Sequence, residues 1–330
     1  MPILYSLVLV LLLGALGYIG GSVSGLRTFF GVVVPYGAIL VFLAGVVYRV
    51  YRWACAPVPF RIPATGGQQK SLPWIKANRI DNPSTALGAF TRMALEILLF
   101  RSLFRNTQSE LRKGPRLVFG ESKFLWLGAL AFHWSFLMIF LRHLRFFMEP
   151  VPGPVLALQG LDGFFQIGTP VVYMTDAIIL AALSYLLLRR VLDSRIRYFS
   201  LPADYFALLL LLGLAISGIV MRYWIKTDVV EIKQLALGLV TFHPAVLEGA
   251  GALFFTHLFL LSVLIAYFPF SKLMHMGGVF LSPTRNLANN NRMKRHVNPW
   301  NYPVKVHSYE EWEEEFRDKI VASGLPLDKE

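Results

Sequence analysis

The chain has very little cysteine. Of its 330 residues only Cys55 is a cysteine. A single cysteine excludes a disulfide within the chain, a CxxC metal site, a cysteine-ligated iron–sulfur cluster and the CxxCH attachment of c-type haem. Any redox cofactor must therefore be held by other side chains.

Charged residues are also scarce. They make up 16% of the sequence, whereas hydrophobic residues make up 55%, a balance outside that of soluble domains and typical of a polytopic membrane protein. The net charge of +12 would suggest nucleic-acid binding in a soluble protein. Here the Lys and Arg residues lie mostly between apolar runs, where positive charge sets membrane orientation, so we expect no nucleic-acid partner.

Long apolar runs are abundant. Six of them are long enough, or nearly so, to cross a hydrocarbon core of about 30 Å as a helix. The first has no basic residue ahead of it and no clear cleavage site, so we interpret it as a helix and not as a secretory signal. The sequence predicts an all-α membrane protein with about six transmembrane helices, at residues 3–20, 31–53, 123–147, 171–189, 203–224 and 249–270.

The basic residues predict the orientation. Residues 56–121 hold ten Lys or Arg against four acidic residues, and the link after the fourth apolar run reads RRVLDSRIR. Loops rich in Lys and Arg stay on the cytoplasmic side. We therefore expect both termini to be cytoplasmic, in a multi-pass protein of the cytoplasmic (inner) membrane.

Two segments outside the apolar runs have the character of cytoplasmic docking elements. A helix over Asp81–Arg105, capped by Ser84 or Thr85, is expected to lie along the inner membrane surface or against a partner. The tail from about residue 280 is unusually aromatic for a solvated segment, which favours docking of a cytoplasmic subunit. A short helix folded back on the chain's own loops is the alternative. The aromatic residues of this tail include Trp300, Tyr302, Tyr309, Trp312 and Phe316.

Four of the seven histidines lie in or beside apolar runs. His133 and His143 belong to the third run, and His257 and His275 to the last. An ionisable group at membrane depth is costly and usually partnered or functional. A single buried histidine is more often a packing residue, but two pairs on two helices are a different case. Since the third and sixth helices are antiparallel in this topology, depth matches His133 with His275 on the cytoplasmic side and His143 with His257 on the outer side.

Each pair of imidazoles is suited to clamp one haem iron between two helices. His133 and His143 are separated by about 15 Å along an ideal helix, too far to share one cofactor. The spacing of His257 and His275 is longer by about 12 Å. Pro269 offers a remedy, because a proline deep in a helix redirects the chain and would swing His275 inward. Zinc is the competing ligand, but a structural zinc site wants four clustered donors.

Charged residues near the outer pair are candidates for supporting roles. Arg142, Arg145 and Arg222 are candidates for neutralising haem propionates. Catalytic residues cannot be named from the sequence. His296 and His307 are expected to contact a partner. Candidates for a quinone or proton-releasing role are Glu149, Asp162, Asp176, Asp228, His243 and Glu248.

The pattern H-x9-H followed by H-x17-H, with FPFSKLM before the last histidine, resembles the gamma subunit of respiratory nitrate reductases over roughly residues 118–277. That resemblance implies a dihaem cytochrome b fold in which the corresponding histidines bind two b haems, paired first with last and second with third. The expected organisation is two N-terminal transmembrane helices (1–55), a basic cytoplasmic loop with an amphipathic helix (56–121), a four-helix dihaem core (122–277) and a docking tail (278–330).

Within that superfamily, the long basic loop and the tail RMKRHVNPWNYPVKVHSYEEWEEEFRDKIVASGLP resemble the membrane cytochrome of the Dsr complex of sulfur metabolism, DsrM. This implies electron exchange with menaquinone, through menaquinol oxidation, and transfer to a cytoplasmic iron–sulfur subunit like DsrK, with DsrJ, DsrO and DsrP as further partners. The membrane cytochrome of methanogen heterodisulfide reductase is a near neighbour.

Two other functions stay open at this stage. One is a haem-containing membrane anchor of a heterodisulfide reductase-like complex, with quinone chemistry in a different subunit. The other is a transporter that uses intramembrane histidines as a proton relay, which predicts no haem. Because a quinol gives up two electrons and a haem accepts one, two haems suit the quinol-oxidising function.

Overall fold

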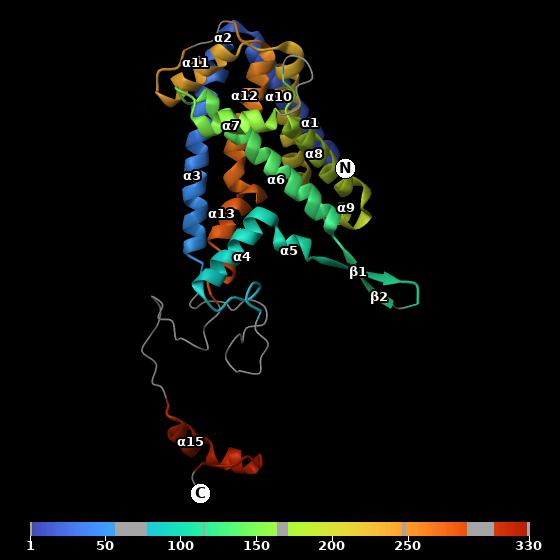
Figure 1. Ribbon diagram of the computed structural model, residues 1–330, viewed down its shortest axis with the longest axis vertical. Helices are drawn as coiled ribbons and strands as arrows, with labels where there is room; N and C mark the ends of the chain where they lie inside the picture. Colours follow the sequence, from blue (N-terminus) through green and yellow to red (C-terminus); the bar gives the residue numbers. More distant parts are fainter. Residues whose placement is uncertain are drawn as a thin grey trace.

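The computed structural model describes residues 2–56, 78–114, 116–163, 171–245, 249–288 and 307–328. Six long helices form its body (Figure 1). They follow the six predicted apolar runs closely, because uniformly apolar segments satisfy their backbone polar groups internally as helices. The long helices are α1 (Pro2–Ser22), α3 (Val34–Ala54), α6 (Lys123–His143), α8 (Met174–Leu192), α10 (Pro202–Val220) and α12 (Ala252–Tyr267).

Shorter elements gather at the two ends of this helical body (Figure 1). At the predicted outer end lie α2 (Ser24–Thr28), η1 (Phe29–Val33), η2 (Leu144–Phe146), α7 (Gly153–Asp162), η3 (Met221–Ile225) and α11 (Val229–Val240). At the predicted cytoplasmic end lie α4 (Ala86–Leu99), α5 (Arg101–Phe104), β1 (Thr107–Arg112), β2 (Arg116–Glu121), α9 (Ser194–Phe199), η4 (Phe268–Phe270), η5 (Lys272–Met274), α13 (His275–Phe280) and α14 (Pro283–Asn286).

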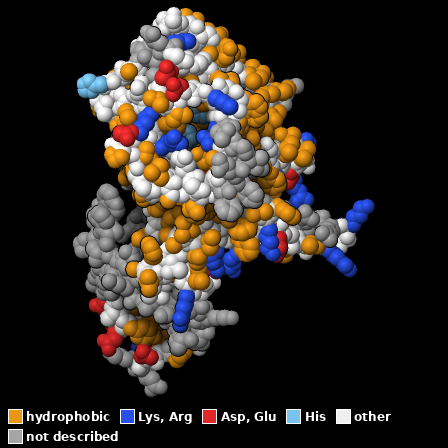
Figure 2. All heavy atoms as spheres, turned by 45° about the horizontal axis from the view of Figure 1, so that its top comes forward, with side chains coloured by type: hydrophobic (Ala, Val, Ile, Leu, Met, Phe, Trp, Pro, Cys, Tyr) orange, Lys and Arg blue, Asp and Glu red, His pale blue; other side chains and the backbone are white. Residues whose placement is uncertain are grey.

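Among the residues that the structure describes, five helical segments are long and apolar enough to cross a bilayer. They are Pro2–Ser22, Ser24–Ala54, Lys123–Phe146, Pro202–Ile225 and Ala252–Phe270. Their outward side chains form a broad apolar surface over the helices, which is visible in Figure 2. Exposed apolar belts of this kind face lipid. The chain is a multi-pass membrane protein.

The sixth predicted span corresponds to α8. Its 19 residues give a length of about 28 Å, which approaches the thickness of a hydrocarbon core. Three charged residues near its two ends, Asp176, Arg189 and Arg190, set it apart from the five more apolar helices. Since α8 packs against α6 and α10, it stays our prediction for the sixth span. The cytoplasmic location of both termini likewise stays a prediction.

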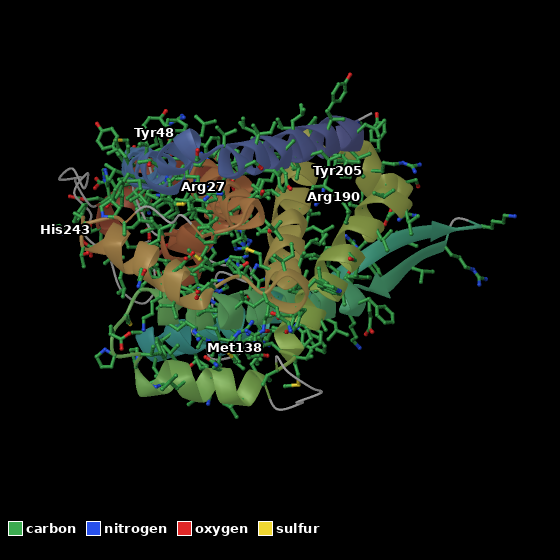
Figure 3. The ribbon with its side chains drawn as sticks, turned by 90° about the horizontal axis from the view of Figure 1, so that it is seen from above. Arg27, Tyr48, Met138, Arg190, Tyr205 and His243 are labelled. Carbon is green, nitrogen blue, oxygen red and sulfur yellow. The ribbon has the colours of Figure 1, made fainter. Side chains whose placement is uncertain are left out.

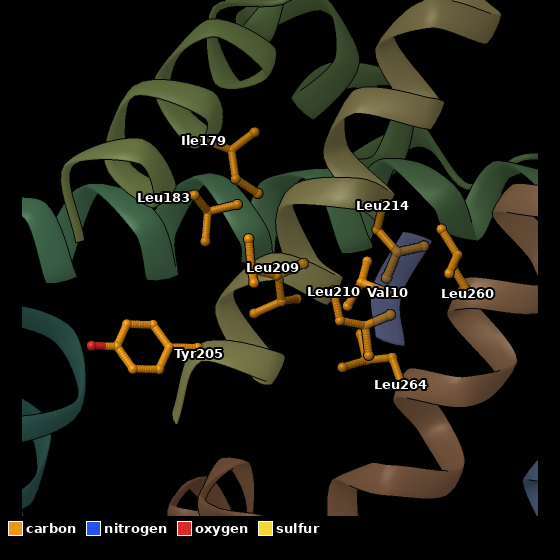
Figure 4. Close-up of a cluster of buried hydrophobic side chains, with 10 residues drawn as sticks. Val10, Ile179, Leu183, Tyr205, Leu209, Leu210, Leu214, Leu260 and Leu264 are labelled. Carbon is orange, nitrogen blue, oxygen red and sulfur yellow. The ribbon is translucent and has the colours of Figure 1, made fainter. Parts of the chain in front are cut away.

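The interior of the helical body is built from aliphatic side chains of several helices. Val10 of α1, Leu183 of α8, Leu210 of α10 and Leu260 of α12 belong to one buried cluster (Figure 4). The helix α1 packs along α10 and α12, and α3 packs along α12. The two N-terminal helices therefore contact the predicted dihaem core directly.

The segment after residue 78, which we predict to be cytoplasmic, departs from the prediction of one helix within Asp81–Arg105. Thr85 caps α4 by accepting a hydrogen bond from the Gly88 amide at 3.2 Å. It is one of the two residues that the sequence predicts as the cap. The helix then ends at Leu99, because Phe100 has a left-handed backbone (φ 49°), and α5 follows. The expected single helix is thus wrong at this break.

A β-hairpin follows where only a basic loop is expected. Strands β1 and β2 pair antiparallel, with Thr107 opposite Glu121. Gly114, with φ 88°, lies in the connection between the two strands, in a backbone conformation that glycine adopts without a steric penalty. The hairpin projects from the helical body (Figure 1).

Asp81 ties the start of the α4–α5 segment to its end, since its carboxylate accepts hydrogen bonds from Arg101, Arg105 and Asn78. Burial raises the pKa of Asp81, but the hydrogen bonds from Arg105, Asn78 and Arg101 outweigh this effect and hold the pKa below its ordinary value of 3.8. A lowered folded-state pKa means that the stabilisation is present above the ordinary pKa and is lost as pH falls through the lowered one.

We therefore expect Asp81→Asn to reduce the hydrogen-exchange protection of residues 86–105 at pH 7, because an amide cannot pair with two guanidinium groups. The wild type should lose the same protection only below about pH 4, where the carboxylate becomes protonated. Protection factors measured by mass spectrometry across this pH range check the expectation. Equal protection of variant and wild type at pH 7 would contradict it.

The last transmembrane helix ends at the proline that the sequence singles out. The helix α12 stops at Tyr267, Pro269 lies in the 3-10 turn η4, and Ser271 is extended (φ −109°, ψ 177°) before η5 and α13. The prediction that Pro269 redirects the chain before His275 is confirmed. The redirection is a break into two 3-10 turns and not the kink of a continuous helix.

The C-terminal tail contains α15 (Tyr309–Ala322). Ser308 and Glu311 form a reciprocal capping box at its start, a pairing that satisfies two otherwise orphaned backbone donors. Trp312 contacts the rings of both Tyr309 and Phe316. The tail residues Trp300 and Tyr302, and His296, lie outside the described residues. Docking of a cytoplasmic subunit by this tail stays a prediction.

Candidate functional site

The structure brings His133 and His275 together at the predicted cytoplasmic end. Their ring centres are 6.0 Å apart and their planes are inclined by 86°. Nδ1 of His133 lies 2.8 Å from the Ala129 carbonyl oxygen, and Nδ1 of His275 lies 2.9 Å from the Lys272 carbonyl oxygen. A carbonyl only accepts, so each Nδ1 carries the proton and each Nε2 keeps its lone pair for a metal.

The turn that presents His275 is tied to α10. Lys272 Nζ lies 2.7 Å from Oδ1 of Asp204, a carboxylate near the start of α10. The Ser271 hydroxyl accepts a hydrogen bond of 3.1 Å from the Leu273 amide and caps η5. Both contacts fix the start of the turn η5, directly before His275.

The predicted outer pair consists of His143, the last residue of α6, and His257 in the first half of α12. Nδ1 of His143 lies 2.7 Å from the Ile139 carbonyl oxygen. Nδ1 of His257 lies 2.8 Å from the Ser217 hydroxyl, which itself donates to the Leu214 carbonyl oxygen at 3.0 Å. Because the hydroxyl proton is used in that bond, Ser217 accepts from His257, and Nε2 of His257 is again available for a metal.

The inner pair fits a bis-imidazole iron site. With metal–nitrogen bonds of about 2 Å and about 1 Å from each nitrogen to its ring centre, two imidazoles that hold one iron would have ring centres about 6 Å apart. The observed separation of His133 and His275 is 6.0 Å. Among the described residues no three His, Cys, Asp or Glu side chains cluster closely enough to hold a metal, so the four-donor set of a structural zinc site has no counterpart there.

A buried network of charges adjoins the outer pair. Arg142, the residue before His143, lies 3.0 Å from Oδ2 of Asp162 and 3.0 Å from Oδ1 of Asp176. Thr175 donates to Asp162 at 2.7 Å, and the Tyr223 hydroxyl donates to Asp176 at 2.9 Å. The positive guanidinium compensates the negative charges of the two carboxylates. Without this pairing, the free energy cost of burying any of these charges in an apolar medium would be several kcal/mol.

Tyr173 lies between two guanidinium groups beside this network. Arg142 Cζ is 3.7 Å and Arg222 Cζ is 3.9 Å from the centre of its ring, distances at which a cation is attracted by an aromatic face. Arg222 also donates to the Val171 carbonyl oxygen at 3.0 Å. Both Arg222 and Tyr223 belong to the π-helical turn η3, a local widening that is often found at functional sites.

The remaining predicted residues of the outer end are not brought into this network. Glu149 pairs with Lys233, Asp228 caps α11 by accepting from the Val230 amide at 2.7 Å, and Glu248 lies outside the described residues. His243 is exposed, and Figure 3 places it at the periphery, away from Met138 in the middle of α6. Arg145 donates to Gln159 at 3.1 Å.

Several residues of the site cannot be found from the sequence pattern. Ser217 and Thr175 are small polar residues in or beside apolar runs, and their only signal is that polar groups at membrane depth usually have partners. Tyr173 and Tyr223 have no signal in their spacing. The absence of a side chain at Gly218 leaves room for His257, because a Cβ there would lie 3.3 Å from Cε1 of His257. Each role depends on a neighbour from another helix.

A bundle of apolar helices with His133 beside His275, and with two further histidines, His143 and His257, on the same two helical segments, is compatible with a membrane cytochrome b. The chain belongs to the nitrate reductase gamma subunit family, whose pattern it matches over residues 87–295. It is 49% identical over 278 residues to the Hdr-like menaquinol oxidoreductase cytochrome b-like subunit of Archaeoglobus fulgidus, with 82% of this chain and 83% of that protein covered. The protein of the same description from Archaeoglobus profundus is 43% identical over 274 residues, with 81% of each chain covered.

Proposed function

We propose that this chain is the membrane cytochrome b subunit of a menaquinol oxidoreductase, and that it binds two b haems. The observation that carries the proposal is the hydrogen bonding of four imidazoles. In each of them Nδ1 makes a hydrogen bond, which leaves the lone pair of Nε2 to bind a metal. The names of the two Archaeoglobus relatives, both menaquinol oxidoreductase subunits, support the quinol substrate. His133 and His275 would hold the inner haem, and His143 and His257 the outer one.

Haem bound at these positions would supply one-electron transfer. The two electrons of a quinol would then be accepted one at a time. The protein's own contribution is to orient the imidazoles. Carbonyl acceptors fix His133, His143 and His275, whereas a side chain, Ser217, fixes His257. Such outer partners of metal-ligating histidines set the ring orientation and the basicity of the ligand.

Quinol oxidation also releases protons, and we assign this task to the buried network at the outer end. The Tyr223 hydroxyl already donates to Asp176, whose second oxygen pairs with Arg142. A proton released beside Tyr223 would therefore meet a carboxylate within one hydrogen bond. Arg222, the second cation on Tyr173, remains the better placed candidate for a haem propionate, because Arg142 is already paired with Asp162 and Asp176.

The finer assignment is a subunit like DsrM in dissimilatory sulfur metabolism, including sulfate reduction. It would pass electrons from the inner haem to a cytoplasmic iron–sulfur subunit like DsrK, with DsrJ, DsrO and DsrP completing the complex. Resemblance of the basic loop and the C-terminal tail supports this proposal. The acidic, aromatic helix α15 is the segment that we assign to contact with the cytoplasmic subunit.

The experiment that tests the proposed function is reduction by a quinol. The haem-loaded full chain is mixed with a menaquinol analogue in a stopped-flow instrument, and the b-type α-band is followed. Rapid appearance of the reduced band is expected. A haem-containing chain that the quinol leaves oxidised, although dithionite reduces it, would instead be a membrane anchor with quinone chemistry in another subunit.

Ser217→Ala should weaken the outer haem site selectively. The variant removes the acceptor for Nδ1 of His257, and loss of such a partner typically lowers the affinity for a metal 10- to 100-fold. We expect the outer haem to be lost first when the detergent-purified protein is titrated with apomyoglobin as a haem acceptor. Ser262→Ala is the matched control, because Ser262 is buried and donates only within its own helix, to Leu258 at 2.8 Å. Equal haem loss in both variants would contradict the assignment.

A further inference from the structure

Phe100 has a backbone conformation that needs an explanation. It is the residue between α4 and α5, and its φ of 49° lies in the left-handed region. A bulky residue in that region is an outlier, which persists only when the surrounding structure imposes it. The ring of Phe100 contacts the imidazole of His133, with centres 4.9 Å apart and planes inclined by 82°.

Two tryptophans of α6 anchor the end of α4. The indole of Trp134 donates to the Leu98 carbonyl oxygen at 3.0 Å, and the indole of Trp126 donates to the Leu99 carbonyl oxygen at 2.7 Å. These carbonyls belong to the last turn of α4, where no later amide of the helix can reach them. Trp126 and Trp134 stand on either side of His133 in the sequence, so the anchoring places Phe100 at His133.

The other side of the break is held as well. The carboxylate of Glu96 accepts hydrogen bonds from the hydroxyl and the backbone amide of Ser102, the amide bond at 3.2 Å. Glu96 thereby satisfies an orphaned donor at the start of α5. An unbroken helix through residue 100 would lose this cap and both indole bonds. The left-handed residue is thus maintained by three side chains from two elements.

We propose that Phe100 is a positioning residue for the inner haem site. Its ring fixes the rotation of the His133 imidazole, and it shields that ligand from cytoplasmic water. Phe132 also contacts His133, at 4.9 Å, but it is the adjacent residue of the same helix and needs no special conformation to do so. The inference rests on the proposed function, in which His133 and His275 bind the inner haem.

The shielding has a consequence for the redox potential. An apolar shell around a metal ligand limits solvent access and lowers the local dielectric constant, which sets the potential of the metal. Water that replaces the Phe100 ring would stabilise the more positive, oxidised state of the inner site. The potential of the inner haem should therefore fall when the ring is removed, while the outer haem, at the other end of α6, should keep its potential.

The test uses the full chain in a His143→Ala background, in which the inner haem alone is expected to remain. Phe100→Leu and Phe100→Gly are compared by redox titration of the b-type band with Phe104→Leu. Phe104 is the matched control, because its ring contacts Trp126 at the same 4.9 Å without reaching His133. The glycine variant is included because glycine adopts a positive φ readily, so that the break in the helix is kept without the ring.

We expect both Phe100 variants to shift the oxidised-to-reduced ratio at fixed potential about tenfold toward the oxidised form, which equals about 59 mV for one electron. The control should be unchanged. An unchanged inner potential in a haem-containing Phe100→Gly chain would overturn the role of Phe100 and leave the proposed function standing. Absence of haem from the chain with native Phe100 would remove both.

Discussion

His133→Ala and His275→Ala are each expected to lower the haem content of the purified chain from two b haems to one, with loss of the inner haem. Their ring centres are 6.0 Å apart, and a haem that these two imidazoles would hold together would lose one of its two protein ligands in either variant. His143→Ala and His257→Ala should each remove the outer haem instead. Pyridine haemochrome assays and low-temperature spectra of the α-band measure the two outcomes.

Double variants make the pairing testable without any assumption about which band is which. The double variant of His133 and His275 should retain one haem, as either single variant does, because both residues serve one site. The double variant of His133 and His257 should retain none. Residues that act on one site are non-additive, whereas residues of separate sites add. One haem retained in the mixed double variant would contradict the pairing.

Arg142→Met is expected to be among the most destabilising substitutions in the chain. Arg142 is 8% exposed and faces the carboxylates of Asp162 and Asp176, which are 1% and 12% exposed. Removal of one partner from a buried ion pair leaves an uncompensated charge and typically costs about 3–5 kcal/mol. We expect a large loss of thermal stability in detergent, measured by a fluorescence or light-scattering melt.

Two comparisons separate this effect from simple loss of packing. Arg145→Met should be mild, because Arg145 is only half-buried and its hydrogen bond is to the neutral Gln159. A triple variant with Arg142→Met, Asp162→Asn and Asp176→Asn should recover much of the lost stability, since no buried charge is then left unpaired. If the triple variant is less stable than Arg142→Met alone, the charge explanation is wrong.

The sequence is sufficient to predict the helical body and the proximity of His133 and His275. Apolar runs such as residues 203–224 form helices in lipid whatever their neighbours are, because no other local structure satisfies their backbone polar groups. The depth matching of His133 with His275 needed only the order and direction of the helices, together with a break at Pro269. Both depend on local rules, and the ring separation agrees with them.

The parts that were missed depend on contacts between elements. The local sequence does not predict the end of the amphipathic helix at Phe100, because two of the three side chains that maintain the break are indoles on α6. Arg142, Asp162 and Asp176 are each recognisable as charged residues near a helix end, yet only the fold joins them into one ion network. Ser217 is inconspicuous among apolar neighbours until α12 places His257 beside it.

The central claim is that two pairs of histidines hold two b haems in this single chain. Its most direct test is a dithionite-reduced minus air-oxidised difference spectrum of the purified full-length protein, with haem quantified against protein. A b-type α-band and two haems per chain are expected. A chain that contains no haem after expression with an adequate haem supply would contradict the claim. One haem retained in the double variant of His133→Ala and His143→Ala would contradict it as well.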